Sequence, residues 1–223
     1  MQHYLTPAAW LLAAYLIGGI PFGFLIGKAR GVDVRTVGSK NIGATNVFRT
    51  VGKKWGFLAL FLDMMKGFAP TYACRLFVAS HNSALANLND QLPLWLPLAV
   101  GVTCAVGHML TPYMKFKGGK GVATGAGMLF GLVPALMGVT FLVFVLFFAA
   151  SNYISLGSCC AAAFIGTAIW FPILGCAGYH DLPQAILVTF IAAFVIYKHR
   201  ANIGRLLAGN ENKIYIFKKG EKK

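Results

Sequence analysis

GVATGAGMLFGLVPALMGVTFLVFVLFFAA, residues 121–150, is a run of 30 residues without a charged side chain, and it decides how the chain folds. As one helix it would rise about 45 Å, well beyond the roughly 30 Å hydrocarbon core of a bilayer. Gly131 and Pro134 interrupt it near its middle, and proline breaks a helix because it has no amide proton to donate. We therefore predict two short helices here. A re-entrant hairpin is the alternative.

Five further apolar runs place the whole chain in a membrane, at residues 7–27, 54–79, 92–111, 154–176 and 183–198. Hydrophobic residues make up 57% of the 223 residues and charged residues only 12%, against about a quarter in soluble domains. The net charge of +14 would suit a nucleic-acid binder, but such a protein would not carry apolar runs of about 20 residues. We predict an all-α, polytopic membrane protein with the bilayer, and no nucleic acid, as a partner.

Positive charge predicts the direction of the helices. Of the 20 Lys and Arg residues, 7 lie in 28–54, 3 in 112–120 and 8 in 198–223. The positive-inside rule therefore puts these three segments in the cytoplasm. An even number of crossings must separate the last two, which requires 121–150 to count as two helices. We predict seven transmembrane helices in a single domain over residues 1–223, with the N-terminus outside and the C-terminus cytoplasmic.

The first basic segment, GSKNIGATNVFRTVGKK at residues 38–54, mixes glycines with hydroxyl and amide side chains. Glycine allows tight turns that bring backbone N–H groups close to a ligand, and Ser39, Asn41, Thr45 and Asn46 can donate hydrogen bonds. Arg49 can bind a phosphate with two hydrogen bonds. A basic loop lying on anionic headgroups is the alternative, but it would not require this clustering of Asn, Thr and Gly.

The second basic segment, GHMLTPYMKFKGGKGVATGAG at residues 107–127, places Lys120 among glycines directly before a helix. A helix N-terminus with unpaired N–H groups is a ready anion site. Gly121 replaces the Ser or Thr that a nucleotide-binding P-loop requires, so the segment is not a Walker A motif. His108 is either a locally bonded helix-end residue or part of a site.

The third basic segment, YKHRANIGRLLAGNENK at residues 197–213, places His199, Asn202 and Arg205 at spacings of three residues. On a helix they share one face. A positive flank that only stops membrane transfer would need Lys or Arg alone, so the His and Asn favour a site. Within the bilayer, Asp63 and Lys66 are predicted to pair with each other and face the bundle interior.

Together, GSKNIGATNVFR, GHMLTPYMKFKGGKGVAT and HRANIGRLLAGNE resemble the three motifs of the bacterial acyl-phosphate-dependent glycerol-3-phosphate acyltransferases. The resemblance covers the whole chain in order and spacing. It implies transfer of a fatty acyl group from acyl-phosphate to the sn-1 hydroxyl of glycerol 3-phosphate, giving lysophosphatidic acid and phosphate. It also implies no cofactor and no metal, and a multi-pass protein of the bacterial cell membrane with its active site at the cytoplasmic face. We expect a monomer.

The resemblance further implies that Ser39, Arg49 and Lys120 bind phosphate groups, with His199 and Asn202 completing the catalytic pocket. Lys40 departs from the family, which usually has glycine there, so a glycine-only backbone conformation would be costly at this position. The expected substrate-binding residues are Asn41, Thr45, Asn46, Lys117, Gly118, Gly119, Gly121, Thr124, Ser155 and Arg205.

Two other classes of membrane protein compete with this interpretation. A transporter of organic phosphates should carry charged or unwound helices near the midplane, often in two related halves. Here nearly all cations lie at one face, and no halves are apparent. A lipid-phosphate phosphatase would need a His- and Arg-rich nucleophile motif, which the sequence lacks.

Overall fold

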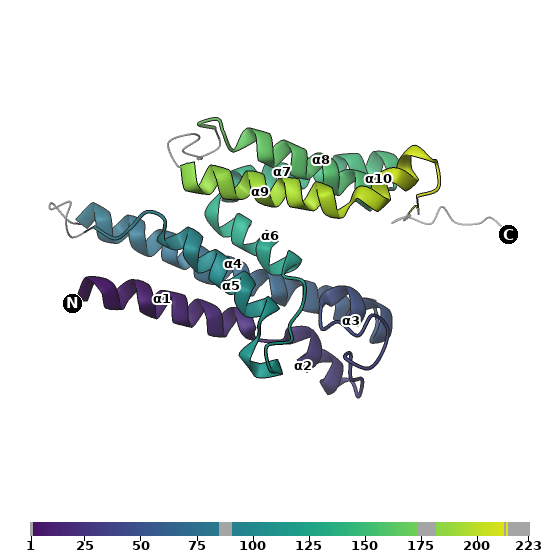
Figure 1. The fold of residues 1–223 in the computed structure, drawn as a ribbon, viewed down its shortest axis with the longest axis horizontal. Coiled ribbons are helices and arrows are strands. Elements are labelled where there is room, and N and C mark those ends of the chain that lie inside the picture. Colours follow the sequence, from purple (N-terminus) through teal and green to yellow (C-terminus); the bar gives the residue numbers. More distant parts are fainter. Residues whose placement is uncertain (1, 85–90, 174–181, 212, 214–223) are drawn as a thin grey trace. The chain divides into compact units, whose positions relative to one another are not determined.

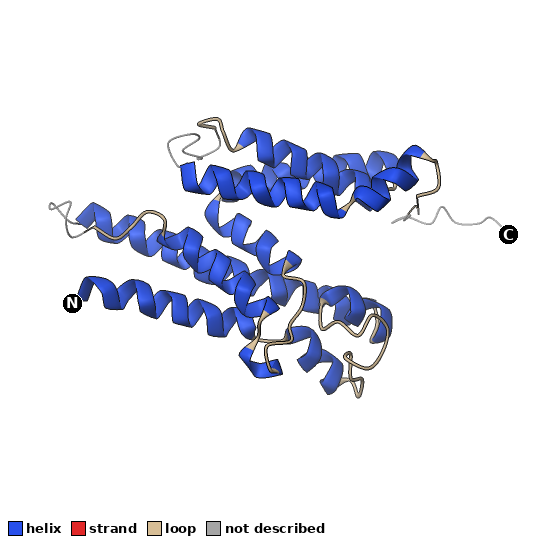
Figure 2. Ribbon diagram, in the orientation of Figure 1, coloured by secondary structure: helices blue, strands red, loops and turns tan. Residues whose placement is uncertain are grey.

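The computed structural model describes residues 2–84, 91–173, 182–211 and 213 (Figure 1). Their regular structure is helical throughout, and no β-strand occurs in these residues (Figure 2). The chain divides into two compact units, Met1–Leu132 and Val133–Lys223, each with its own packing. The prediction of one domain over 1–223 stays a prediction.

The first unit is built around a long central helix. Its elements are α1 (Gln2–Gly19), α2 (Phe22–Ala29), α3 (Ala44–Thr50), α4 (Lys53–Ala84), α5 (Leu96–Met109), the 3₁₀ turn η2 (Pro112–Met114) and α6 (Val122–Leu132). α4 packs against α3, α5 and α6, while α1 packs against α5. Part of the core of this unit is a cluster of fully buried apolar side chains that includes Cys74, Leu96, Val100 and Cys104.

The first apolar run is interrupted at Pro21, because proline cannot donate the hydrogen bond that would continue α1 into α2. Two carbonyl groups at the break accept side-chain hydrogen bonds instead. Thr111 Oγ1 donates to Gly19 O over 2.6 Å, and Lys66 Nζ donates to Ile20 O over 2.7 Å. These bonds satisfy two carbonyl groups that would otherwise lack a partner wherever water is excluded.

The predicted division of 121–150 into two helices is confirmed. α6 ends at Leu132 and α7 (Pro134–Ser151) begins two residues later, with Pro134 at its first position. Proline suits that position because its missing N–H would have no partner inside the helix. The break therefore falls where the sequence placed it.

The second unit consists of α7, α8 (Ile154–Ala168), α9 (Leu182–Lys198) and α10 (Arg200–Leu207). α8 packs against α7 and α9, and α10 packs against both α8 and α9. Trp170 Nε1 donates a 2.9 Å hydrogen bond to Thr189 Oγ1, which ties the end of α8 to α9. Asn152 ends α7 in a left-handed conformation, with φ of 62°, which asparagine tolerates well.

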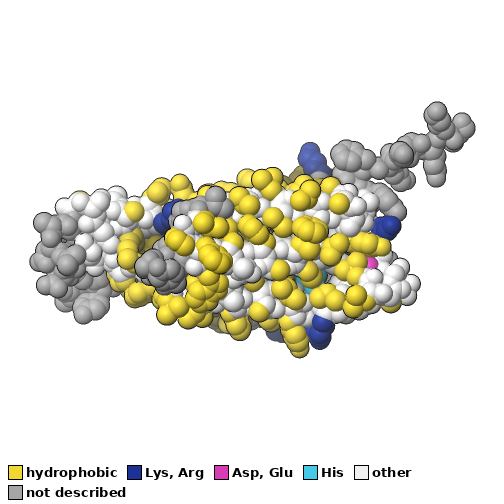
Figure 3. Space-filling model, turned by 90° about the horizontal axis from the view of Figure 1, so that it is seen from above, with side chains coloured by type: hydrophobic (Ala, Val, Ile, Leu, Met, Phe, Trp, Pro, Cys, Tyr) yellow, Lys and Arg dark blue, Asp and Glu magenta, His cyan; other side chains and the backbone are white. Residues whose placement is uncertain are grey.

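Large apolar side chains on the outside are typical of a protein surrounded by lipid. On α7, for example, Phe141, Leu142 and Leu146 are all more than half exposed. Hydrophobic side chains also dominate the face drawn in Figure 3. By length and composition, three described helical stretches can cross a membrane, Pro7–Ala29, Leu96–Met114 and Pro134–Ser151, or four if α9 and α10 form one bent span. Seven spans and an external N-terminus stay predictions.

Four cysteines of the described residues carry free thiols. Cys74 and Cys104 are buried, and Cys159 and Cys160 are partly exposed. Cys176 lies outside the described residues.

Candidate functional site: two basic loops and a carboxylate cluster

Asn46 holds the first basic loop in shape. Its side chain is only 2% exposed, and its Oδ1 accepts a 2.9 Å hydrogen bond from the backbone N–H of Ser39. Its Nδ2 donates to Val34 O over 2.7 Å and to Val37 O over 3.2 Å. All these bonds join the side chain to the loop backbone, so Asn46 positions the loop rather than presenting its amide to a ligand.

The other predicted residues of this loop are more accessible. Ser39, Thr45 and Arg49 are exposed, with Thr45 and Arg49 on α3. Asn41 is partly exposed, and its Oδ1 accepts a 2.8 Å hydrogen bond from the Gly43 N–H, which tightens the turn into α3. Ser39 and Arg49 are therefore free to meet a ligand in the way their residue types suggest.

Lys40 adopts the conformation that glycine would take without cost. Its φ is 56°, in the left-handed region. For a residue with a Cβ atom this conformation costs roughly 1–2 kcal/mol. A lysine at this position therefore does not change the conformation of the loop. Instead, the backbone of residue 40 is strained.

Two glycines of the second basic loop pack against the end of α5. The Gly118 N–H donates to Met109 O over 3.0 Å, and the Gly119 N–H donates to His108 O over 3.1 Å. A Cβ at Gly118 would overlap the His108 carbonyl oxygen, and one at Gly119 would overlap the His108 imidazole. These two glycines are required for packing, and their N–H groups are directed at protein carbonyls rather than at a ligand.

Lys120 and Gly121 complete this loop at the start of α6. Lys120 is exposed, and Gly121 has φ of 75°, a left-handed value that favours glycine. Thr124, two residues into α6, is fully buried against α4, and its Oγ1 has no hydrogen-bond partner among the described residues. Of the predicted residues here, Lys120 is exposed and Thr124 is enclosed.

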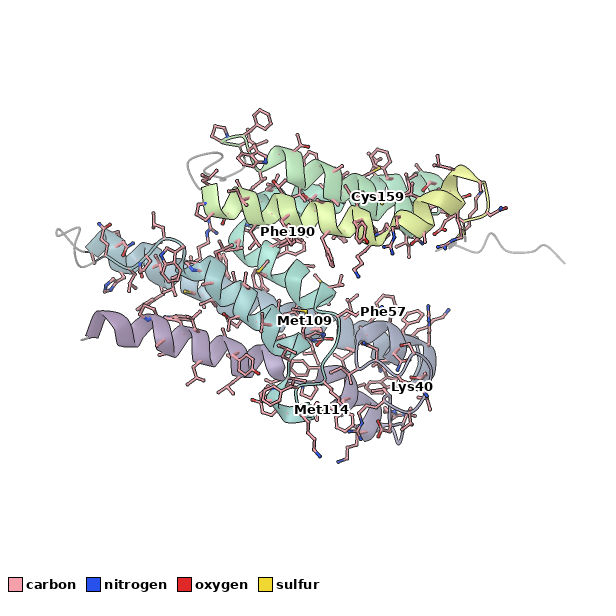
Figure 4. The ribbon with its side chains drawn as sticks, in the orientation of Figure 1. Lys40, Phe57, Met109, Met114, Cys159 and Phe190 are labelled. Atoms are coloured by element: carbon pink, nitrogen blue, oxygen red, sulfur yellow. The ribbon has the colours of Figure 1, made fainter. Side chains whose placement is uncertain are left out.

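The two basic loops of this unit meet at a pocket of about 500 Å³. It is lined by Arg35, Lys40, Ile42, Tyr113, Met114, Lys115, Lys117 and Gly118, and Figure 4 marks Lys40 and Met114. The sequence predicted Lys117 and Gly118 as ligand residues. It did not predict Arg35, Lys40 or Lys115 as ligand residues, because their positive charge alone fits a headgroup-facing loop equally well; Lys40 stood out only for the backbone conformation of its position.

Arg35 is fixed by a carboxylate and an aromatic ring. Its guanidinium bonds both oxygens of Asp33, the shortest bond being 2.7 Å, and lies 4.5 Å from the centre of the Phe24 ring. The hydrogen bond from the Arg35 side chain lowers the pKa of Asp33 to about 2. Asp33 is therefore ionised at neutral pH, and its charge offsets that of Arg35.

Beneath the second loop lies a buried group of charged and polar side chains. Lys66 Nζ is 2.8 Å from Asp63 Oδ1, and each side chain is 2% exposed, which confirms the predicted pairing inside the bundle. His108 Nδ1 lies 3.6 Å from the same Asp63 oxygen. Because Gly118 and Gly119 rest on His108, this group supports the loop that carries Lys120.

In the second unit, three predicted residues gather around Glu211. Ser155 Oγ donates to Oε1 over 2.9 Å, Asn202 Nδ2 donates to the same oxygen over 2.7 Å, and Arg205 Nε donates to Oε2 over 2.7 Å. The bond from Asn202, followed by those from Arg205 and Ser155, lowers the pKa of Glu211 below its ordinary 4.5. Glu211 was not among the site residues expected from the sequence.

His199 marks the joint between α9 and α10. It precedes the first residue of α10, and its ring Nδ1 lies 2.8 Å from Val195 O. In the neutral tautomer with a proton on Nδ1, that nitrogen donates to Val195 and leaves Nε2 as an acceptor. His199 is the N-cap of α10, the short helix that carries Asn202 and Arg205, and its carbonyl accepts a 2.8 Å hydrogen bond from the Ile203 N–H.

The described residues contain no group of three His, Cys, Asp or Glu side chains of the kind that could hold a metal ion. The first unit thus offers exposed cations and hydroxyls that suit an anion, whereas the amide of Asn202 and the guanidinium of Arg205 in the second unit already bind the carboxylate of Glu211.

Comparisons with known proteins agree with this chemistry. The family model for glycerol-3-phosphate acyltransferase matches residues 8–209. A glycerol-3-phosphate acyltransferase of Endomicrobium trichonymphae is 41% identical over 214 residues, covering 94% of this chain and 96% of that protein. One from Trichlorobacter lovleyi is 43% identical over 205 residues, covering 92% and 95%.

Solved structures give the same answer at the level of the fold. The crystal structure of PlsY (YgiH), an integral membrane glycerol 3-phosphate acyltransferase, in its glycerol 3-phosphate form matches with a TM-score of 0.69 and 37% identity. The match covers 94% of this chain and 96% of that one. Its lysophosphatidic acid form matches with a TM-score of 0.67 and 35% identity. Sequence, fold and family model therefore converge, and the chain belongs to the glycerol-3-phosphate acyltransferase family.

Proposed function

We propose that this protein transfers a fatty acyl group from acyl-phosphate to the sn-1 hydroxyl of glycerol 3-phosphate, giving lysophosphatidic acid and inorganic phosphate. Family membership supports the acceptor and the reaction type. The observation that carries the proposal is the cationic pocket where the two basic loops of the first unit meet. Both substrates carry a phosphate, and a site rich in cations and neutral donors suits two such groups.

The proposed mechanism is direct transfer without an acyl-enzyme. The sn-1 oxygen forms a bond to the acyl carbon, the bond from that carbon to the phosphate oxygen breaks, and phosphate leaves. Ser39, Lys120 and Asn202 stabilise charge on the carbonyl and the leaving phosphate, while Arg49 and His199 complete the catalytic set. The ten substrate-binding residues expected from the sequence shape the substrate pocket.

The hydroxyl proton goes to a phosphate oxygen of the substrate in this mechanism. A carboxylate base would have to be near the reacting groups and free to accept. Glu211 accepts hydrogen bonds from Ser155, Asn202 and Arg205, and its lowered pKa makes it a weaker base than an ordinary glutamate. This supports a substrate oxygen over Glu211 as the proton acceptor.

The setting we propose is the bacterial cell membrane, with the protein acting as a multi-pass monomer whose active site faces the cytoplasm. The excess of Lys and Arg in 28–54, 112–120 and 198–223 supports that orientation. The fatty tail of the donor can then lie among the apolar helices while its phosphate meets the basic loops.

One assay separates this function from its rivals. Purified protein in detergent is incubated with labelled glycerol 3-phosphate and, in parallel, with acyl-phosphate, acyl-CoA or acyl carrier protein carrying the same chain. We expect labelled lysophosphatidic acid with acyl-phosphate alone. Equal product from a thioester donor would contradict the proposed donor, and no product from any donor would contradict the enzyme itself.

Two further measurements test the mechanism. Lys120→Ala should reduce turnover at least about 100-fold, since a charge-assisted contact to the reacting phosphate is lost, while the unfolding temperature stays near that of wild type. Lys53→Ala, an exposed lysine at the start of α4, is the matched control. Mass spectrometry of the enzyme during turnover should find unmodified Ser39, and an acylated Ser39 would replace direct transfer with a two-step route.

A further inference from the structure

The end of α5 holds the chain directly before Lys120 through backbone and side chain together. The His108 carbonyl accepts a 3.1 Å hydrogen bond from the Gly119 N–H. The carbonyl of Met109, which Figure 4 marks, accepts a 3.0 Å bond from the Gly118 N–H. The imidazole of His108 lies so close to Gly119 that a Cβ there would meet its Nε2. The orientation of this ring therefore affects the path of the loop.

The ring of His108 is in turn directed by Asp63 on α4. Nδ1 of the imidazole lies 3.6 Å from Asp63 Oδ1, and neither atom has a hydrogen-bond partner among the described residues. This distance exceeds that of a full hydrogen bond. Two buried polar atoms still attract each other where water is excluded, provided that Nδ1 carries the proton. The carboxylate thus favours one tautomer and one orientation of the ring.

Asp63 is held in place by a second buried charge. Lys66 Nζ lies 2.8 Å from Asp63 Oδ1, as an ion pair whose angles are not those of a hydrogen bond, and each side chain is 2% exposed. The same Nζ donates a 2.7 Å hydrogen bond to Ile20 O, at the break between α1 and α2. The carboxylate that faces His108 is therefore fixed by parts of the fold outside the loop.

Stability alone does not explain three buried ionisable side chains. Taking charged groups out of water costs several kcal/mol, and apolar side chains of similar volume often stabilise a protein as well as a buried ion pair does. Buried polar groups can instead select one arrangement of the chain among several. In this unit the selected arrangement is that of His108, against which Gly118 and Gly119 pack.

We propose that His108 is a positioning residue for acyl transfer: oriented by Asp63, it sets the path of residues 118–119 and thereby the place of Lys120. The inference rests on the proposed function, in which Lys120 stabilises charge on the reacting groups. A displacement of about 1 Å in such a group can reduce the rate about 100-fold. Loss of His108 therefore acts on turnover through Lys120.

A double-mutant cycle tests this connection. The values of kcat for His108→Ala, Lys120→Ala and the double variant are compared with that of the wild type, using labelled glycerol 3-phosphate in detergent. We expect His108→Ala to reduce kcat about 10- to 100-fold when Lys120 is present. It should reduce kcat less than about 3-fold when residue 120 is alanine, because the group that it positions is gone. Equal losses in both backgrounds would overturn the positioning role.

Val100→Ala is the matched control for a general loss of stability. Val100 is fully buried on α5, about two turns before His108, and belongs to the cluster that contains Leu96 and Cys104. Its truncation leaves a cavity and lowers the unfolding temperature. Any loss of kcat in Val100→Ala should be the same with and without Lys120. A background dependence as large as that of His108→Ala would reduce the effect of His108 to stability and contradict the proposal.

A measurement on the loop itself does not depend on activity. Hydrogen–deuterium exchange followed by mass spectrometry reports on the Gly118 and Gly119 amides, which are bonded to the end of α5. In His108→Ala, peptides that cover 116–124 should exchange at least about 10-fold faster, and in Val100→Ala they should stay near wild type. Unchanged exchange in His108→Ala would overturn the proposal. Wild-type protein that makes no lysophosphatidic acid would contradict the proposed function, and the exchange result would still decide whether His108 holds the loop.

Two further variants separate the ring from its link to Asp63. His108→Asn can place an amide N–H near the position of Nδ1 and so keeps a donor toward Asp63, whereas His108→Leu keeps similar volume without a donor. At similar unfolding temperatures, we expect His108→Asn to retain a kcat at least about 3-fold higher than that of His108→Leu, the effect of about one hydrogen bond. Equal or reversed values would show that volume alone matters, and would remove Asp63 from the proposal.

Discussion

Asn46 illustrates how one residue type can serve two purposes that sequence does not separate. Its position among Thr, Gly and Arg predicts a donor for a phosphate, but its amide is fully used by Ser39, Val34 and Val37 within the loop. The exposed hydroxyl of Ser39 then remains for a ligand. The same chemistry that binds an anion also binds a backbone, and only the fold decides which partner is nearer.

Asn46→Ala should therefore destabilise the first unit by about 2–3 kcal/mol, because a buried carbonyl and a backbone N–H lose their partners. Activity should fall with it, since Ser39 is no longer held. Thermal unfolding in detergent measures the first effect. Thr45→Ala removes a neighbouring exposed side chain and should leave the unfolding temperature within a degree or two, and an equal loss in both variants would contradict the positioning role.

Glu211 leads to a pH-dependent prediction. Its pKa in the folded protein is lowered below the ordinary 4.5, chiefly by the hydrogen bond from Asn202. The bonds to the ionised Glu211 therefore stabilise the protein fully at a pH above 4.5. This stability is lost as the pH falls through the lower folded pKa, where Glu211 takes up a proton.

Comparing wild type with Glu211→Gln measures the contribution. We expect the variant to unfold at a lower temperature at pH 7, and the difference between the two proteins to shrink as the pH is lowered from about 5 toward 3. A difference that stays constant over this range would mean that the charge of Glu211 is not what holds Ser155, Asn202 and Arg205.

At the scale of elements, α6 depends on close contact with α4. A Cβ at Gly127 would overlap the Met64 carbonyl oxygen, and one at Gly67 would overlap the Thr124 carbonyl oxygen. The two backbones thus approach in a way that only glycine permits, as in other close helix pairs in membranes. This contact fixes the start of α6, and with it Lys120.

Gly127→Ala should destabilise the first unit by about 1–3 kcal/mol, the usual cost of overpacking, and should lower turnover by displacing Lys120. Gly125→Ala is the matched control, because a Cβ there would meet no atom within 4 Å. Unfolding temperature and turnover of both variants test this. Similar behaviour of the two would argue against a packed contact at Gly127.

Sequence patterns predicted the helix boundaries well wherever a boundary depends on the residue that stands there. Pro134 ends one helix and starts another because of its own chemistry, and the apolar run at 183–198 became α9 with its boundary shifted by one residue. The break at Pro21 is equally local. By contrast, Gly118 and Gly119 are required because a Cβ at either position would overlap His108. The sequence alone does not reveal a contact of this kind.

At the scale of the whole molecule, the distribution of Lys and Arg predicts on which side of the membrane each loop lies. If the chain crosses the membrane seven times, Lys115 and Lys213 both face the cytoplasm, and Ser83 faces the outside. Single cysteines are introduced at these positions after the five native cysteines are replaced. A membrane-impermeant thiol reagent added to intact cells should label position 83 and spare positions 115 and 213. Labelling at 213 with protection at 115 would indicate an odd number of crossings between them.

The candidate site was predictable from sequence only in its chemistry. Three basic segments rich in glycine, amide and hydroxyl groups indicated an anion, and two of these segments do meet at a pocket in the first unit. Which lysines line that pocket was not predictable, because Lys40 and Lys115 differ from any surface lysine only through the loop conformation. The role of Glu211 was likewise hidden, since its partners Ser155 and Asn202 are 56 and 9 residues away.

The shortness of α6 has a consequence for how the protein is made. With 11 residues it rises only about 16 Å, and an apolar segment needs about 20 residues to enter a bilayer on its own. α4 and α5 precede it in the chain and present the surface on which it packs. Insertion of α6 must therefore follow that of its neighbours. The loop that carries Lys120 is then set late, after the rest of the first unit is in the membrane.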